Sequence, residues 1–118
     1  MGGKITSGSD VLIVLEDGKS RVLRFKGQKV DTHKGMMAAD LLEGCDFGKV
    51  VLTNAGRKAY LLEPALVDYV PKLSRRTQVM YPKEMGYLVL RLGIRPGSKV
   101  LEGGTGSGVS TCIVANLV

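Results

Sequence analysis

The stretch of this chain best suited to chemistry is a glycine-rich segment, residues 102–108 (EGGTGSG), which lies between two apolar stretches. Val100 and Leu101 predict a short buried strand before it, and apolar residues at helical spacing predict a helix over 109–118. Each glycine costs about 0.5–1 kcal/mol relative to alanine in regular structure, so the segment favours a function that needs bare backbone. The N–H groups at the start of the following helix suit an anion, and Glu102 suits a cation.

Three ligand classes use a strand, a glycine turn and a helix, and the spacing separates them. A phosphate-binding P-loop requires Gly-Lys-Ser/Thr, but Gly108 is followed by Val109 and Ser110, which excludes it. A dinucleotide fingerprint needs a small residue at position 109, where this chain has Val109, so the spacing disfavours a dinucleotide site. The remaining pattern, Glu-x-Gly-x-Gly-x-Gly, resembles the first motif of the Rossmann-like methyltransferases that use S-adenosylmethionine. A glycine-rich turn without a ligand is the alternative.

Composition and charge narrow the class of protein. The 118 residues are 44% hydrophobic, which suits a globular domain, and their net charge is +6. Residues 71–99 hold seven basic residues against one acid, Glu84, so the whole excess lies there. Such a run is usually a solvated face, but it also suits a polyanionic substrate such as nucleic acid. The sequence shows neither a signal peptide nor an apolar run long enough for a membrane span, so we expect a soluble, cytoplasmic protein without membrane contact.

The first 62 residues predict a small β-domain of hairpins. The polar start, residues 1–10, is expected to fray, and His33 is interpreted as a structural or surface residue. Cys45 and Cys112 are interpreted as two buried thiols, because they show no metal-ligand spacing. The predicted elements are strands at 11–15 and 21–25, a short strand at 29–33, a helical turn at 38–42, and strands at 49–53 and 58–62.

Two helices are predicted after the β-domain. Pro64 opens the first, which stops at Pro71. Pro82 opens the second, whose apolar stripe runs from Met85 to Leu92 and ends at Gly93. A turn at Pro96-Gly97 then leads to the predicted strand before the glycine segment.

Three segments together carry a more specific resemblance: 76–84 (RTQVMYPKE), 94–97 (IRPG) and 100–108 (VLEGGTGSG). They resemble the tRNA (adenine-N1)-methyltransferases that modify the T-loop adenine at tRNA position 58. Residues 33–35 and 48–64 also look like the N-terminal β-domain of that family. The resemblance implies methyl transfer from S-adenosylmethionine to adenine N1 in tRNA, after the base has been flipped out of its stack. Glu84 stands where the family usually has aspartate.

The resemblance also implies roles for individual residues. It implies that the intact protein assembles as a homotetramer. The residues that would bind the cofactor are Gln78, Val79, Tyr81, Glu102, Gly104, Thr105, Gly106, Ser107, Gly108 and Val109. The residues that would contact tRNA are Arg57, Lys58, Lys72, Arg75, Arg76 and Lys83.

The chain departs from the family in length, because family members are roughly twice as long. We therefore expect an N-terminal fragment of mixed α+β and α/β class, with a β-domain at 1–63, a linker helix and basic segment at 64–77, and a truncated start of a Rossmann-like methyltransferase domain at 78–118. The catalytic aspartate is expected beyond the C-terminus. The chain alone is expected to be inactive, with an affinity for S-adenosylmethionine weaker than micromolar.

The truncation also has an expected effect on folding. A strand at 100–101 would lack a parallel neighbour, so residues 1–70 are predicted to fold independently. The last third is expected to be loosely held, to self-associate or to pack against the β-domain. Two other functions stay open: a non-catalytic RNA-binding subunit, and a methyltransferase that acts on a different substrate.

Overall fold

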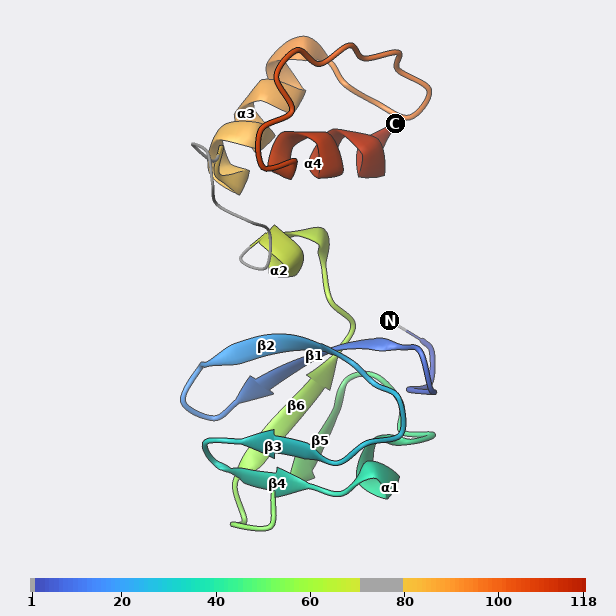
Figure 1. The fold of residues 1–118 in the computed structure, drawn as a ribbon, viewed down its shortest axis with the longest axis vertical. Helices are drawn as coiled ribbons and strands as arrows, with labels where there is room; N and C mark the ends of the chain where they lie inside the picture. The colour runs from blue at the N-terminus through green and yellow to red at the C-terminus, as the bar shows by residue number, and fades with distance from the viewer. Residues whose placement is uncertain (1, 71–79) are drawn as a thin grey trace. The chain divides into compact units, whose positions relative to one another are not determined.

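The computed structural model describes residues 2–70 and 80–118, which belong to two compact units (Figure 1). Unit 1 is Met1–Asp68 and unit 2 is Tyr69–Val118. The finer division predicted from the sequence, with a linker at 64–77, stays a prediction.

Unit 1 is built from antiparallel strands. Its larger sheet has the order β2-β1-β6-β5, and a second sheet pairs β3 with β4. The two predicted hairpins, the strand near residue 30 and the helical turn are confirmed, but the sequence analysis missed β4, which is only three residues long. The elements are β1 Asp10–Leu15, β2 Ser20–Arg24, β3 Val30–Thr32, β4 Gly35–Met37, α1 Ala39–Leu42, β5 Lys49–Leu52 and β6 Lys58–Leu62.

The core of unit 1 lies between the four-stranded sheet on one side and β3, β4 and α1 on the other (Figure 1). Side chains alternate along β1, so that Ile13 and its second neighbours face inward. They pack in one cluster with Phe25 and Met37, both of which are fully buried. Burying a side chain of this size stabilises the fold by about 1.5–3 kcal/mol.

Residues 3–10 do not fray, which corrects the prediction for this part of the N-terminal segment. Ile5 is fully buried in the core. Its N–H donates to the Cys45 carbonyl oxygen at 2.8 Å, and its own carbonyl accepts from Gly44 N–H at 2.8 Å. Composition alone was misleading here, because one buried isoleucine with two backbone hydrogen bonds fixes a segment that is otherwise polar.

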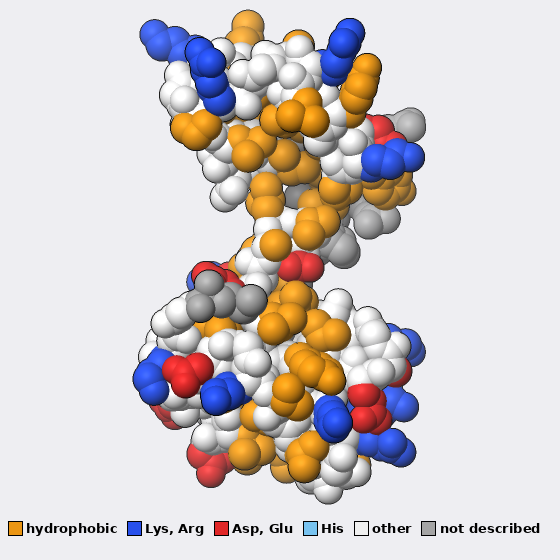
Figure 2. Space-filling view, turned by 180° about the vertical axis from the view of Figure 1, so that it is seen from behind, with side chains coloured by type: hydrophobic (Ala, Val, Ile, Leu, Met, Phe, Trp, Pro, Cys, Tyr) orange, Lys and Arg blue, Asp and Glu red, His pale blue; other side chains and the backbone are white. Residues whose placement is uncertain are grey.

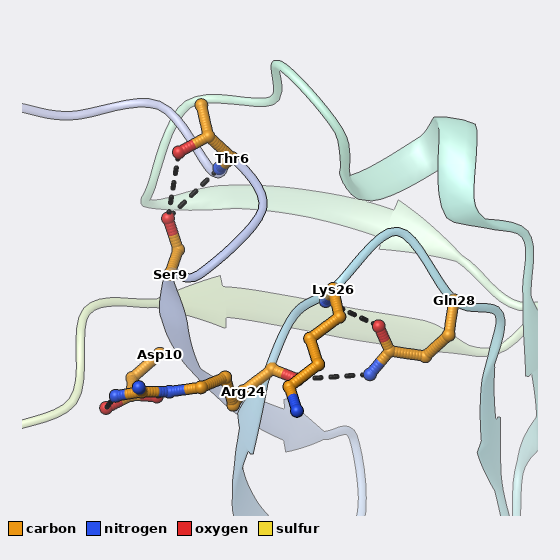
Figure 3. A network of polar contacts seen from close by, with 6 residues as sticks. All are labelled: Thr6, Ser9, Asp10, Arg24, Lys26 and Gln28. Atoms are coloured by element: carbon orange, nitrogen blue, oxygen red, sulfur yellow. Dashed lines mark hydrogen bonds and ion pairs between the residues drawn. The ribbon is translucent and has the colours of Figure 1, made fainter.

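Polar contacts tie the start of β1 to the end of β2 (Figure 3). Arg24 Nε donates to Asp10 Oδ1 at 2.8 Å across the two strands, and Gln28 Nε2 donates to the Arg24 carbonyl oxygen at 3.0 Å. Just before β1, Ser9 Oγ accepts from Thr6 N–H at 3.0 Å. Hydrogen bonds therefore hold together the two ends of the first hairpin, where the chain enters β1 and leaves β2.

The three hairpin turns of unit 1 are linked by side chains. Arg57 Nη1 lies 3.1 Å from Glu16 Oε1, which joins the β5–β6 turn to the β1–β2 turn. Thr53 Oγ1 donates to the Lys34 carbonyl oxygen at 2.8 Å, which joins the β5–β6 turn to the β3–β4 turn. His33 Nε2 and Asp17 Oδ2 lie 2.6 Å apart at the surface, so His33 is a surface residue as predicted.

The contact between Asp17 and His33 predicts a pH dependence. The hydrogen bond to His33 lowers the pKa of Asp17 below its ordinary value of 3.8, with a further contribution from the Lys19 backbone N–H. Because the pKa is lower in the folded state, Asp17 stabilises unit 1 above pH 3.8, and this contribution disappears as the pH falls through the folded pKa. Urea unfolding should therefore show a smaller acid-induced loss of stability in Asp17→Asn than in the wild-type chain. An equal loss in both proteins would contradict this.

Helices dominate the described part of unit 2. The helix α2, Leu66–Tyr69, spans the boundary between the units, and Asp68 Oδ2 accepts from Ala65 N–H just before it. The longer helix α3, Pro82–Leu92, begins at the predicted proline and ends at Gly93 in the left-handed conformation. The last helix is α4, Val109–Leu117. Met85 of α3 and Val109 and Ile113 of α4 are buried.

The predicted strand at Val100–Leu101 is wrong. The described part of unit 2 contains no strand, and Leu101 is 98% exposed. A strand needs a neighbouring backbone to accept its hydrogen bonds, and residues 80–118 supply none. The prediction of two buried thiols is also wrong, because Cys112 is exposed and Cys45 is only partly buried.

In residues 2–70 and 80–118, no helix is both long enough and apolar enough to span a membrane. Among the same residues, no three His, Cys, Asp or Glu side chains gather as a metal-ion site would require.

Candidate functional site

A pocket of about 480 Å³ lies in unit 2, between the start of α3 and the segment that leads into α4. We call it the loop pocket, and we call residues 102–108 the glycine loop. Volumes of this size are typical of small-molecule sites. The lining residues are Met80, Tyr81, Glu84, Glu102, Gly104, Thr105, Gly106, Ser107, Val109 and Ser110.

The glycine loop leaves open space above its backbone. Gly104 has φ +80°, a conformation that side chains disfavour, and a Cβ built on it would meet no protein atom within 4 Å. Neighbouring protein atoms would therefore leave room for a side chain at position 104. Gly104 is one of the residues that line the loop pocket, so a ligand there can approach its bare backbone.

The loop ends at the N-terminus of α4, where donors are available. Gly108 is the N-cap residue and has no side chain, so it makes no capping hydrogen bond to the first turn. The first N–H groups of a helix have no partner within the helix, and the helix dipole adds partial positive charge there. This corner of the loop pocket suits a carboxylate or another small anion.

Two carboxylates lie at the same pocket. Glu84 comes from the first turn of α3, and Glu102 begins the glycine loop. Glu102 Oε2 accepts a hydrogen bond from Thr111 Oγ1 of α4 at 2.6 Å, which holds the carboxylate beside the helix start. The pocket thus presents acids for a cation and N–H groups for an anion, a combination that complements the ammonium and carboxylate of an amino acid.

The structure brings most of the predicted cofactor residues together. Seven line the loop pocket: Tyr81, Glu102, Gly104, Thr105, Gly106, Ser107 and Val109. Gly108 stands beside them as the helix N-cap, and Gln78 and Val79 lie outside the described residues.

Four further residues at this site were not predicted from the sequence: Met80, Glu84, Ser110 and Thr111. The first three line the loop pocket, and Thr111 binds Glu102. A signal existed for Glu84, an acid in the first turn of a proline-initiated helix. Ser110 and Thr111 are polar residues in the first turn of an otherwise apolar helix, which is also a detectable pattern.

The predicted RNA-contacting residues fall in both units. Arg57 and Lys58 lie at the β5–β6 turn of unit 1, where Arg57 is ion-paired with Glu16, and Lys83 is exposed on α3 of unit 2. Lys72, Arg75 and Arg76 lie outside the described residues.

Solved structures with a similar fold are methyltransferases. A SAM-dependent O-methyltransferase from Thermotoga maritima matches 97% of this chain and 43% of its own, with a TM-score of 0.85 and 28% identity. The tRNA (m1A58) methyltransferase TrmI from Aquifex aeolicus matches 98% of this chain and 45% of its own, with a TM-score of 0.78 and 26% identity. These matches confirm the predicted fold class, a small β-domain followed by the first elements of a Rossmann-like methyltransferase domain.

Curated relatives that are similar in sequence are also methyltransferases. The tRNA (adenine(57)-N(1)/adenine(58)-N(1))-methyltransferase TrmI of Methanocaldococcus jannaschii is 34% identical over 108 residues, which are 91% of this chain and 37% of the relative. The catalytic subunit TRM61 of the tRNA (adenine(58)-N(1))-methyltransferase of Eremothecium gossypii is 34% identical over 110 residues, which are 88% of this chain and 27% of the relative. The chain therefore spans well under half the length of these relatives.

One family model overlaps the loop pocket directly. It describes the GCD14 subunit of the tRNA methyltransferase complex, and it matches residues 58–118, which include α3, the glycine loop and α4. Since this match covers more than half of the 118 residues, the chain belongs to the GCD14 family of tRNA methyltransferase subunits.

Proposed function

We propose that the loop pocket binds the methionine part of S-adenosylmethionine, and that the protein which carries these residues methylates N1 of a T-loop adenine in tRNA. The observation that carries this proposal is the charge pattern of the pocket. Glu84 and Glu102 lie on the same pocket as the free N–H groups at the start of α4. The methionine part of this cofactor carries an ammonium, a carboxylate and a sulfonium, which match those groups in sign.

Three features of the pocket hold the ligand. The N–H groups at the start of α4 bind the carboxylate, while Glu102, oriented by Thr111, faces the ammonium. Gly104 lets the ligand lie on the main chain. When bound, S-adenosylmethionine supplies an electrophilic methyl group on its sulfonium sulfur. The chain contributes position, because a ligand held in one orientation reacts faster than one that tumbles.

Other parts of the proposal rest on the family resemblance. Gln78 and Val79 would wall the same pocket beside Tyr81. The tRNA would lie on basic residues, which we propose to be Arg57, Lys58, Lys72, Arg75, Arg76 and Lys83. We also propose that the protein is cytoplasmic, because its proposed substrate is tRNA. We also propose a homotetramer, as the resemblance implies.

Ligand binding can be tested on the chain as it stands, by NMR titration with S-adenosylmethionine. This method detects weak binding, which is what we expect here. We expect shifts concentrated in the amides of residues 102–111. In Gly104→Ala the added methyl group fills space at the pocket and strains the backbone, so the dissociation constant should rise about tenfold, equivalent to about 1.4 kcal/mol.

Gly97→Ala is the matched control for this variant. Gly97 has nearly the same φ, +84°, and equally open surroundings, but it does not line the loop pocket. It should bind the cofactor like the wild-type chain. Shifts that are absent, or that fall mainly in residues 1–68, would overturn the cofactor proposal.

The substrate is tested separately. The protein that carries these residues should transfer a tritiated methyl group to a tRNA transcript with adenine at position 58, and not to a transcript with guanine there. A protein that binds S-adenosylmethionine but labels neither transcript would point to the other open function, methylation of a different acceptor.

A further inference from the structure

A second cavity, of about 380 Å³, lies in unit 1, and none of the residues assigned so far to the cofactor or to tRNA lines it. We call it the sheet cavity. It lies beside β1, β2 and the β3–β4 hairpin. Its lining residues are Ile13, Leu15, Lys19, Ser20, Arg21, Asp31, Thr32 and His33.

The back of the sheet cavity is apolar. Ile13 and Leu15 belong to the inward face of β1 and are 1% and 5% exposed, yet both contribute to the lining. A ligand in this cavity therefore meets hydrocarbon at the back, where a fully charged group would lose its hydration without compensation.

The rim carries cations and hydroxyl groups. Lys19 and Arg21 are exposed at the edge, and Arg21 Nη2 donates to the Asp31 carbonyl oxygen at 2.6 Å. That bond uses one of the five N–H groups of the guanidinium and ties β2 to β3. His33 is held by Asp17 at 2.6 Å. Part of the rim, Arg21 and His33, is thus held in place by hydrogen bonds.

We propose that the sheet cavity binds a single unstacked nucleotide of an RNA, with the base against Ile13 and Leu15 and the phosphate beside Lys19 and Arg21. A flat ring with little charge suits the apolar back, and a phosphate suits the cationic rim. Unpaired, splayed-out bases are the part of an RNA that proteins bind in such cavities. The identity of this RNA as tRNA rests on the proposed function, but nucleotide binding by the cavity does not.

The acids near the cavity already have cationic neighbours. Asp31 Oδ2 lies 4.0 Å from Lys29 Nζ, and Asp17 accepts hydrogen bonds from His33 and from the Lys19 N–H. Their repulsion of a phosphate is therefore reduced. An acidic peptide would also find the cations, but it has no flat apolar part to fill the back of the cavity, so the nucleotide is the better match.

The test is an NMR titration of the full chain, without S-adenosylmethionine, using four probes: AMP, adenosine, inorganic phosphate and a short single-stranded RNA. We expect saturable shifts in the amides of residues 19–21 and 31–33 with AMP, and tighter binding with the RNA. Inorganic phosphate and adenosine should each bind at least about fivefold more weakly than AMP, because each keeps only half of the contacts.

A pair of variants gives the control. Lys19→Gln removes a rim cation while leaving the backbone hydrogen bond of residue 19 to Asp17 in place, and it should weaken AMP and RNA about fivefold. Lys26→Gln removes an exposed lysine of the same unit that does not line the cavity, and it should change binding less than twofold.

Three results would overturn the inference. If inorganic phosphate binds as tightly as AMP, the cavity is only a cationic surface. If AMP binds but the RNA does not, the cavity is a site for a free nucleotide. If no saturable shift appears at residues 13–33, the cavity is not a binding site. These outcomes are independent of the proposed function, because its own test measures shifts in residues 102–111 with S-adenosylmethionine.

Discussion

Gly35→Ala should destabilise unit 1 by about 2–5 kcal/mol, the sum of overpacking and of a left-handed alanine. Gly35 begins β4 with φ +117°. A Cβ there would lie 2.7 Å from Thr53 Oγ1, 2.9 Å from Thr53 Cβ and 2.7 Å from Asn54 Oδ1. Neither side chain can move freely, because Thr53 is 4% exposed and Asn54 Oδ1 accepts a hydrogen bond from Met36 N–H. Urea unfolding followed by circular dichroism would measure the loss.

Gly18→Ala separates the two causes of this loss. Gly18 also has a left-handed φ, +83°, but a Cβ there would meet nothing within 4 Å. Its alanine variant should therefore lose only the strain energy, about 1–2 kcal/mol. If both variants lose the same amount, the close approach of Gly35 to Thr53 contributes nothing to stability.

Met85→Ala should unfold unit 2 while unit 1 stays folded. Met85 is 1% exposed, and among the described residues of unit 2 the only other buried hydrophobic residues are Val70, Val109 and Ile113. Truncating a buried methionine to alanine costs about 2–5 kcal/mol. So small a core has little stability to lose, so we expect hydrogen exchange to become fast throughout residues 82–117. Amides of residues 10–62 should keep their protection, as the predicted independent folding of the two parts requires.

Leu90→Ala is the matched control on the same helix. Leu90 is 82% exposed, so its truncation removes little buried surface and should leave the exchange pattern unchanged. If Met85→Ala lowers protection equally in residues 10–62, the two units depend on each other for stability, and the prediction of independent folding is wrong.

The sequence predicted the elements that local residues determine. Pro82 and Gly93 mark the two ends of α3, because proline fits the first helical turn and glycine tolerates the left-handed conformation that ends it. The two main hairpins followed in the same way from alternating side chains and turn residues. The glycine loop was found because few ligand sites use that spacing.

The errors at Ile5 and at Val100–Leu101 have a common cause, which is that the missing information lies outside the segment itself. Val100 and Leu101 are apolar enough for a strand, but a strand also needs a neighbouring backbone. Ile5 is ordered by Gly44 and Cys45, about forty residues away. Thr111 is a different case, because its partner Glu102 lies only nine residues earlier, and its place in the first turn of α4 was a signal that the sequence contained.

The register of unit 1 has a consequence for the order in which the protein is made. In the four-stranded sheet the first strand lies next to the last, with Leu12 opposite Leu62. The central pairing therefore cannot form on the ribosome until residue 62 has been synthesised and released from the exit tunnel. Translation reaches the glycine loop some forty residues later. The β-domain can thus be complete before the glycine loop emerges, and errors in the loop should not disturb the folding of the β-domain during synthesis.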